Sequence, residues 1–242
     1  MNHALIMKKL QIKPFVFLLI AAFGFTSCEV YDDYGPVVQQ EYRAVRFFDG
    51  IEVPANVTVI LTQGTGRDII VEADNNTLFS VETYVRKNTL IINKIGGWSS
   101  PVKLYVQVPD LVYISTAGNG EVYGETVWDV RDIDLRVNGN GCINMEINAR
   151  REIDARVAGS GKIFLEGDSR NVYYEVTGSG IIQGFNLLSN RGIVSMAGSG
   201  SCELTALDIL DGDISGNGVV YFRGYPSIKT RITGNGDLFD AN

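Results

Sequence analysis

In the stretch Glu175-Val176-Thr177-Gly178-Ser179-Gly180-Ile181-Ile182-Gln183, a Gly-Ser-Gly triplet separates two short alternating runs, and this triplet decides the fold. Gly-X-Gly, with only Asn or Ser in the middle, occurs seven times. The triplets begin at Gly118, Gly139, Gly159, Gly178, Gly198, Gly216 and Gly234, at intervals of 21, 20, 19, 20, 18 and 18 residues. A fixed period near 20 residues is typical of repeat proteins in which each period forms one supersecondary unit.

Apolar residues alternate with polar ones on both sides of every triplet. Two positions before it stand Thr116, Val137, Val157, Val176, Met196, Ile214 and Ile232. Two positions after it stand Val122, Ile143, Ile163, Ile182, Cys202, Val220 and Leu238. The intervening positions are mixed and often charged, and no window shows a helical period. Alternation with a period of two predicts strands with one buried face.

Two all-β architectures fit this pattern. In a series of hairpins each triplet would be a tight turn, since Gly and Asn supply positive φ angles. In a parallel β-helix each period would be one coil, with the triplet at a corner. We favour the β-helix because the alternation continues through the triplet, so that both glycines should face inward at the bend. The middle Asn or Ser should then stack on its copy one coil away and form a hydrogen-bonded ladder.

The first 27 residues are expected to be a lipoprotein signal peptide. They combine three lysines, Lys8, Lys9 and Lys13, with an apolar run over residues 15–25 that is short for a membrane span. Small residues precede Cys28, which is therefore the predicted lipidation site. An ordinary secretory signal with an incidental cysteine is the alternative. Residues 28–43 should be a flexible tether.

Charge limits the classes of partner. Without residues 1–27 the chain has 18 basic and 28 acidic residues, a net charge of −10. A negative surface of this size argues against nucleic acid and anionic lipid as partners. We expect contact with the membrane through the lipid anchor only.

Residues 44–110 are rich in short strands but are not in register with the later repeat. Because a solenoid must cover its first coil, we expect them to form an N-terminal β cap with irregular coils. Residues 111–242 should form the repeats. The motifs Phe48-Asp49-Gly50-Ile51, Val57-Thr58-Val59, Gln63-Gly64 and Val71-Glu72-Ala73-Asp74, followed by the triplets, resemble the head GIN domain of autotransporter adhesins over residues 44–242. The resemblance implies a right-handed β-helix on a secreted or surface-attached protein without established enzymatic activity.

The sequence offers few residues that could act in catalysis. His3 is the only histidine, so a processed chain has no Ser–His or Cys–His pair and no zinc site of the usual type. Cys142 and Cys202 should point to opposite faces, three coils apart, which predicts no disulfide. We therefore expect no catalytic residues, no metal and no cofactor.

One column of carboxylates suggests an alternative. Asp134, Asp154 and Asp211 all lie five positions before a triplet. Neighbouring acids could hold calcium or serve a polysaccharide-active enzyme. A solvated acidic face is the simpler interpretation, and we prefer it.

An outward column of aromatic residues is the stronger candidate. Three positions after each triplet stand Tyr123, Asn144, Phe164, Gln183, Glu203, Tyr221 and Phe239. Rings beside amide groups suit a sugar, which needs an apolar platform and hydrogen-bonding groups. The candidate ligand-binding residues are Tyr123, Asn144, Phe164, Gln183, Tyr221 and Phe239. The alternative is that the cap or a third strand of each coil covers this face.

Together these features predict an outer-membrane lipoprotein of the cell envelope, with the leaflet and so the exposure at the cell surface left open. Its expected function is that of an adhesin, a non-catalytic binding module for a glycan or a protein partner. A structural or self-assembling envelope protein is the alternative, and a polysaccharide-active enzyme is less favoured. The oligomeric state is left open.

Overall fold

The structure, a computed structural model, describes residues 38–66, 68–96 and 100–242. Within these ranges the chain forms seventeen strands and one short helix. None of the described helices is both long and apolar enough to cross a bilayer. The expected signal peptide and the expected lipidation site, Cys28, lie outside the described residues.

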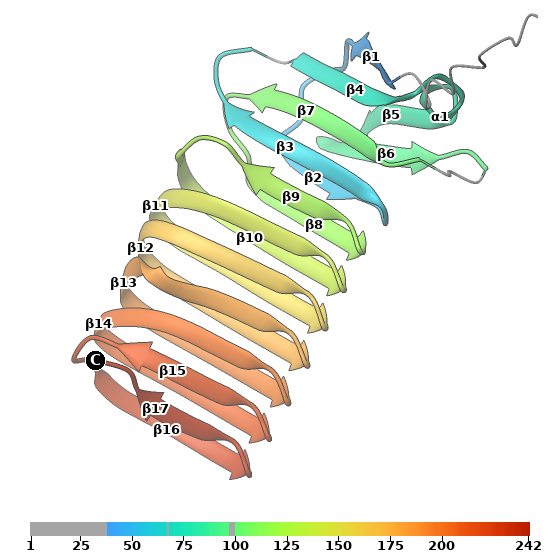
Figure 1. Ribbon diagram of the computed structural model, residues 1–242. Helices are drawn as coiled ribbons and strands as arrows, with labels where there is room; N and C mark the ends of the chain where they lie inside the picture. The colour runs from blue at the N-terminus through green and yellow to red at the C-terminus, as the bar shows by residue number, and fades with distance from the viewer. Residues whose placement is uncertain (1–37, 67, 97–99) are drawn as a thin grey trace, which may run out of the picture. The chain divides into compact units, whose positions relative to one another are not determined.

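The repeats form a parallel β-helix, as the triplet spacing predicts (Figure 1). Five long strands make its middle coils: β10 (Trp128–Gly139), β11 (Cys142–Gly159), β12 (Lys162–Gly178), β13 (Ile181–Gly198) and β14 (Ser201–Gly216). Three shorter strands complete it: β15 (Val219–Arg223), β16 (Ser227–Gly234) and β17 (Asp237–Asp240). Every pairing among these strands is parallel, which excludes the hairpin alternative.

Each coil has two extended stretches, one on either side of the triplet. We call the outward surface of the stretches that precede the triplets face A, and that of the stretches that follow them face B. Register shifts, such as the one between Ala149 and Glu152, mark the bend opposite the triplet. Equivalent residues of successive coils are paired, for example Val137 with Val157 and Val157 with Val176. These inward residues are buried and stack into one core.

The two glycines of a triplet have different structural roles. The second glycine faces inward, and a Cβ on Gly200 would lie 2.7 Å from Cγ1 of Val176. The first glycine has a positive φ, between 61° and 132°, and a Cβ on Gly178 would lie 2.7 Å from the carbonyl oxygen of Gly159. The expectation that both glycines face inward is thus wrong for the first, which is required by backbone conformation and close approach.

The corner is held mainly by backbone hydrogen bonds. In every triplet after the first, the amide of the middle residue donates to the carbonyl of the first glycine one coil back, as in Ser179 to Gly159 at 2.9 Å. The expected side-chain ladder forms among the described residues only where asparagines adjoin: Asn235 donates to Asn217 at 3.3 Å, and Asn119 to Asn56 at 2.7 Å. A serine side chain is too short to span about 4.8 Å between coils.

Coil order departs from chain order in the N-terminal part. β2 (Gly50–Val53) and β3 (Val57–Gln63) form a coil that lies between two others. On one side it pairs with β6 (Thr89–Lys94) and β7 (Val102–Val108). On the other it pairs with β8 (Tyr113–Gly118) and β9 (Glu121–Gly124), which continue into the repeats. The first coil in sequence is therefore internal.

Antiparallel strands close this end. β4 (Asp68–Asp74) pairs with β7 and with β1 (Val38–Arg43), and β5 (Val81–Arg86) pairs with β6. Residues 38–43, assigned to the tether from sequence, thus belong to the wound sheet. The short helix α1 (Asn75–Leu78) follows Asp74, whose side chain accepts from the amides of Asn76 and Thr77 at 2.9 and 3.0 Å. Hydrogen bonds from Ser100 and Thr77 lower the pKa of the Asp74 carboxyl to about 2.

Candidate functional site: the aromatic column of face B

The structure brings the six candidate residues together in one row across the strands of face B. Asn144 lies between Tyr123 and Phe164, and Gln183 follows Phe164. Glu203 comes next, and then Tyr221 and Phe239. Neighbouring strands are about 4.8 Å apart, so the row follows the axis along which the coils stack. We call this row the aromatic column.

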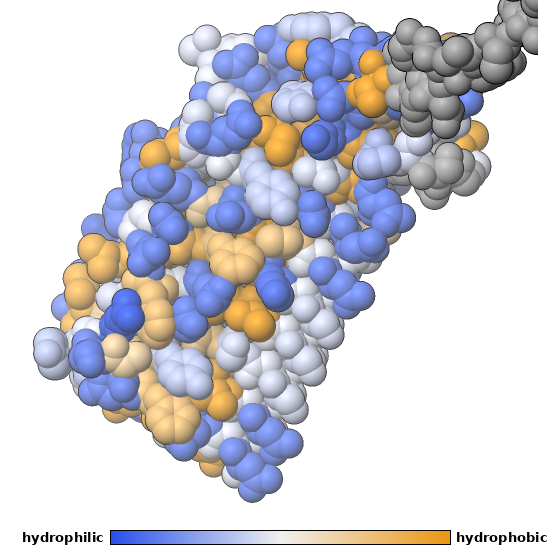
Figure 2. All heavy atoms as spheres, viewed as in Figure 1, coloured by the Kyte–Doolittle hydropathy of each residue, from blue (hydrophilic) through white to orange (hydrophobic). Residues whose placement is uncertain are grey.

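The column is open to solvent in the described part of the chain. All seventeen described strands belong to the one wound sheet, so no third strand of the coil lies over face B. Tyr221 and Phe239 are 37% and 46% exposed, while Tyr123 and Phe164 are half-buried. Figure 2 shows ring-bearing side chains following one another between hydrophilic groups over the coils. The rings are therefore available to a ligand and are held in place at their bases.

Direct contacts order the column. The rings of Tyr221 and Phe239 are stacked, with centroids 5.6 Å apart and planes inclined by 21°. The amide of Gln183 donates to the Glu203 carboxylate at 3.3 Å. Burial and the neighbouring Glu121 carboxylate raise the pKa of the Tyr123 hydroxyl, so that it remains a hydrogen-bond donor at neutral pH. Contacts within the column thus position two of its rings and two of its polar groups before a ligand binds.

The column continues beyond the repeats onto the cap. Tyr123 pairs with Ile60, Ile60 with Tyr105, and Tyr105 with Ile70, which in turn pairs with Tyr42. The repeat pattern missed these four residues because they do not follow a triplet. Period-two alternation does place Ile60 on an outward position, but its neighbours depend on the coil order, which sequence does not reveal.

A shallow hollow of about 260 Å³ lies at this end of the column. It is lined by Tyr42, Thr62, Asp68, Ile70, Tyr105, Val106 and Gln107. The Tyr105 hydroxyl lies 3.5 Å from both carboxylate oxygens of Glu72. A hydrogen bond to Asp68 raises the pKa of Tyr42. The hollow thus combines aromatic walls with carboxylate, amide and hydroxyl groups.

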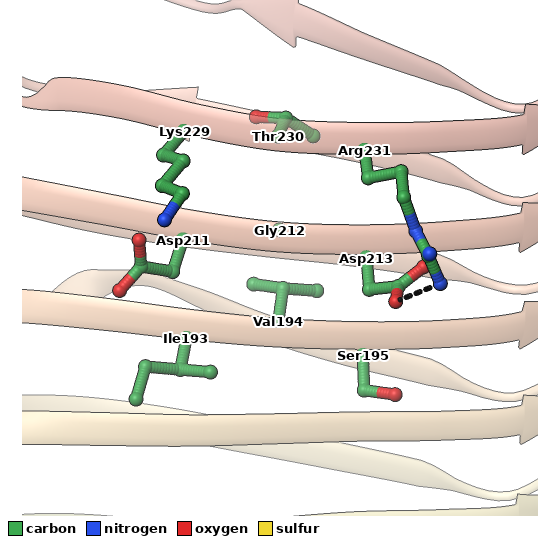
Figure 3. Close-up of a pocket in the computed structure, with 9 residues that line it drawn as sticks. All are labelled: Ile193, Val194, Ser195, Asp211, Gly212, Asp213, Lys229, Thr230 and Arg231. Atoms are coloured by element: carbon green, nitrogen blue, oxygen red, sulfur yellow. Dashed lines mark hydrogen bonds and ion pairs between the residues drawn. The ribbon is translucent and has the colours of Figure 1, made fainter.

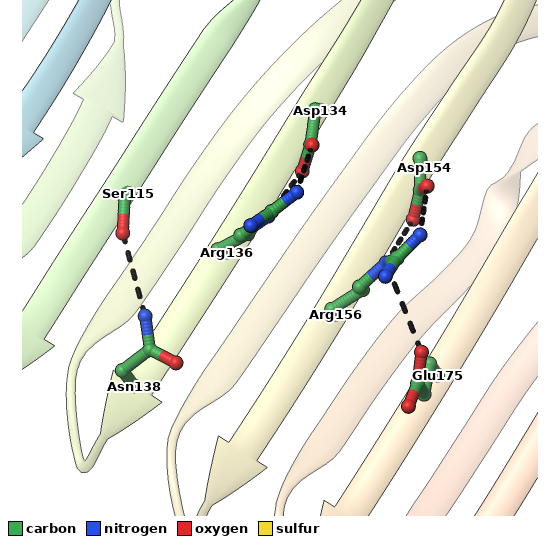
Figure 4. Close-up of polar contacts among 7 residues, drawn as sticks. All are labelled: Ser115, Asp134, Arg136, Asn138, Asp154, Arg156 and Glu175. Carbon is green, nitrogen blue, oxygen red and sulfur yellow. Dashed lines mark hydrogen bonds and ion pairs between the residues drawn. The ribbon is translucent and has the colours of Figure 1, made fainter.

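Face A has a different chemistry. Asp134 accepts two hydrogen bonds from Arg136, at 2.9 and 2.6 Å, and Asp154 accepts two from Arg156, at 2.8 and 2.5 Å (Figure 4). Asp211, the third aspartate of the carboxylate column, accepts from Arg191 at 2.5 Å. The described residues contain no group of three or more His, Cys, Asp or Glu side chains placed to hold a metal. The carboxylates that suggested a calcium site are therefore hydrogen-bonded to arginines.

Aromatic rings on face A support these arginines. Arg136 lies over the Tyr113 ring and Arg156 over the Tyr173 ring, with guanidinium carbons 5.5 and 5.3 Å from the centroids. The hydrogen bonds to Asp154 raise the pKa of Arg156. The guanidinium groups of Arg136 and Arg156 are thus paired within face A.

A wider hollow of about 450 Å³ lies on face A over β13, β14 and β16 (Figure 3). Ile193 lies at one side, and the pair Arg231–Asp213, 3.0 Å apart, at the other. Lys229 extends toward Asp211. The hollow contains no ring and its charges have both signs, so it offers less to a sugar than face B does.

Both described cysteines are free thiols. Cys142 lies on the outward side of β11 and is partly exposed, while Cys202 is buried in the core. Burial raises the pKa of each thiol, which disfavours the reactive thiolate. Neither cysteine is prepared for nucleophilic chemistry.

Several solved structures share this fold. A putative adhesin from Bacteroides fragilis is 23% identical, with a TM-score of 0.76, over 84% of this chain and 97% of its own. A putative adhesin from Parabacteroides distasonis is 21% identical, with a TM-score of 0.69, over 84% and 96%. A putative lipid binding protein from the same species is 20% identical, with a TM-score of 0.67, over 84% and 97%. At these identities the likeness establishes the fold alone.

No curated protein matches the chain. The model of one protein family does: "Putative auto-transporter adhesin, head GIN domain" matches residues 47–226. This range covers the cap from residue 47 onward and six of the seven triplets. The chain therefore belongs to the head GIN domain family of auto-transporter adhesins.

Proposed function

We propose that this protein is a non-catalytic binding module of the cell envelope, and that it attaches to a glycan through the aromatic column of face B. The observation that carries the proposal is the row of outward aromatic and polar side chains, in register on successive strands. Membership of an adhesin family supports a role at the cell surface.

The contrast between the two faces supports the choice of face B. On face A the arginines and aspartates neutralise one another, and a ligand would have to break bidentate pairs such as Arg136–Asp134. Among the described residues, no ion pair joins two residues of the aromatic column. Face B therefore presents rings whose burial by a ligand has a small desolvation cost.

A glycan fits the column better than a protein surface does. Protein interfaces are usually broad patches with a central cluster of anchors. The column is one residue wide and places Asn144, Gln183 and Glu203 between its rings. Such a line suits a narrow ligand with apolar ring faces and hydroxyl groups at its edges.

We further propose that Cys28 is lipidated and anchors the domain to the outer membrane. The support is the sequence before it, a basic and then apolar leader ending in small residues. A lipid anchor together with a binding face would hold the cell to its ligand. The absence of histidine beyond His3 supports a binding role over catalysis.

A paired substitution tests the function. We expect the double variant Tyr123→Ala/Phe164→Ala of the purified full-length protein to lose at least about tenfold in affinity on a glycan array, equivalent to about 1.4 kcal/mol. The matched control is Tyr113→Ala/Tyr173→Ala, which removes two rings from face A. Circular dichroism establishes that both variants are folded.

Two outcomes would overturn the proposal. Equal binding by wild type and the face B variant would show that the column is not the site. Absence of binding to every glycan, combined with concentration-dependent self-association, would favour the structural alternative. Capture of a protein partner that depends on Tyr123 and Phe164 would retain the site and replace the ligand.

A further inference from the structure

We infer that the ligand is a linear, uncharged polysaccharide that lies across the strands along the aromatic column and continues onto the cap. This inference rests on the proposed function and adds the ligand's class, its direction and a second contact region. The second region is formed by Tyr42 and Tyr105, which the cap strands β1 and β7 contribute.

The spacing of the rings carries the inference. Tyr42, Tyr105, Tyr123 and Phe164 occupy every second position of the row, with Ile70, Ile60 and Asn144 between them. At about 4.8 Å per strand, successive rings are about 10 Å apart. Two β-linked pyranose units in an extended chain have a similar length, so such a chain would place every second sugar over a ring.

This regular series is not a by-product of the sequence repeat. Tyr42 lies on an antiparallel cap strand, Tyr105 on the outermost coil and Tyr123 at the start of the repeats. These three tyrosines lie in one row only because the order of the coils in space differs from their order in the chain. Within the strict repeats the spacing is less regular, since Phe164 and Tyr221 are separated by Gln183 and Glu203.

The polar groups of the column can form hydrogen bonds with sugar hydroxyls. Asn144 and Gln183 offer amides, and the tyrosines offer hydroxyls whose pKa is raised at Tyr42 and Tyr123. At the cap end, Asp68 and Gln107 line the hollow beside Tyr42 and Tyr105. Sugar hydroxyls donate to carboxylates and accept from amides, so each of these groups has a partner on an uncharged chain.

The charges around the column disfavour an acidic polysaccharide. Glu146 and Glu166 are paired on neighbouring strands of face B, one row from the column, and Glu203 lies in the column itself. On the other side the row contains Glu121 and Lys162 around Cys142. The cations Lys103 and Arg223, two residues from Tyr105 and Tyr221, are fewer than these carboxylates. Carboxylates of a uronic acid chain would meet this excess of like charge, which costs affinity at low salt.

Binding by oligosaccharides of increasing length tests the inference. Six strand intervals separate Tyr42 from Phe164, about 29 Å, so affinity for β-1,4-linked glucose or mannose oligomers should rise at least tenfold from two to about six units. Galacturonate oligomers of equal length should bind at least tenfold more weakly. Isothermal titration calorimetry on the full-length protein measures both.

Variants of the cap separate this inference from the proposed function. Tyr42→Ala and Tyr105→Ala should each weaken binding of the six-unit oligomer at least fivefold, while Tyr105→Phe should retain binding. Tyr173→Ala on face A is the control. Loss of glycan binding in Tyr123→Ala/Phe164→Ala, without any effect of length or of the cap variants, would overturn this inference and keep the proposed function. Preference for the acidic oligomers would also overturn it. Failure of all variants to alter binding would overturn both.

Discussion

At the scale of single residues, the stability of the fold should depend on the glycines of each triplet. We expect Gly178→Ala to destabilise the protein by about 2–4 kcal/mol, because φ is +111° and the new Cβ would lie 2.7 Å from the Gly159 carbonyl oxygen. Ser179→Ala, at the exposed neighbour, should change stability by less than about 0.5 kcal/mol. Urea denaturation followed by circular dichroism measures both, and equal midpoints would refute the role of the corner.

Sequence reasoning could place residues of the repeat on their faces but not determine their backbone angles. Strict alternation put Val157, Tyr174 and Cys202 inside and Tyr123 and Phe164 outside, as the structure has them. The same alternation assigned both glycines of a triplet to the interior. It could not reveal that the first glycine leaves the extended region, since a side-chain pattern contains no information on φ.

At the scale of elements, the helix cap at Asp74 should make the N-terminal end sensitive to acid. Its pKa of about 2 in the folded protein is below the value of about 3.9 expected for an unfolded chain. A depressed pKa contributes stability above the unfolded value, and that stability is lost as pH falls from about 4 to about 2.

We therefore expect Asp74→Asn to reduce the dependence of the unfolding midpoint on pH between about 4 and 2, because Asn accepts the amides of Asn76 and Thr77 without titrating. The matched control is Asp110→Asn, at an exposed position in the loop after β7. Thermal unfolding across this pH range measures the effect. Parallel pH curves for Asp74→Asn and wild type would contradict the assignment.

The cap also marks where element-level prediction ends. Short strands could be predicted within residues 44–110, but β1 lies in the stretch that was assigned to a tether. Pairing of β2 with both β6 and β8 joins segments 39 and 63 residues apart, as in Gly50 with Thr89 and with Tyr113. Local sequence patterns do not determine which distant strands pair. For this reason the sequence did not predict that Tyr42, Tyr105 and the residues between them continue the column onto the cap.

At the scale of the whole molecule, each coil contacts only its neighbours in the stack, so that removing a whole coil should leave the other interfaces intact. Deleting residues 178–197 removes one coil and joins Thr177 to Gly198, and since Thr177 pairs with Ala197 the register is preserved. We expect this variant to fold with reduced stability. Deleting residues 178–187, half of a coil, should leave the inward residues without a continuous core and prevent cooperative folding.

The coil deletion also tests the column, because it removes Gln183 and leaves Glu203 as the one residue between Phe164 and Tyr221. Tyr221 would then lie two strands from Phe164, about 10 Å away, and would extend the regular series of rings that begins at Tyr42. If an uncharged polysaccharide follows that series, the shortened protein should bind oligomers of about eight units more tightly than wild type does, although it is less stable. Isothermal titration calorimetry on the two proteins measures this difference in affinity. Weaker binding of these oligomers by a folded deletion variant would show that ring spacing does not govern recognition.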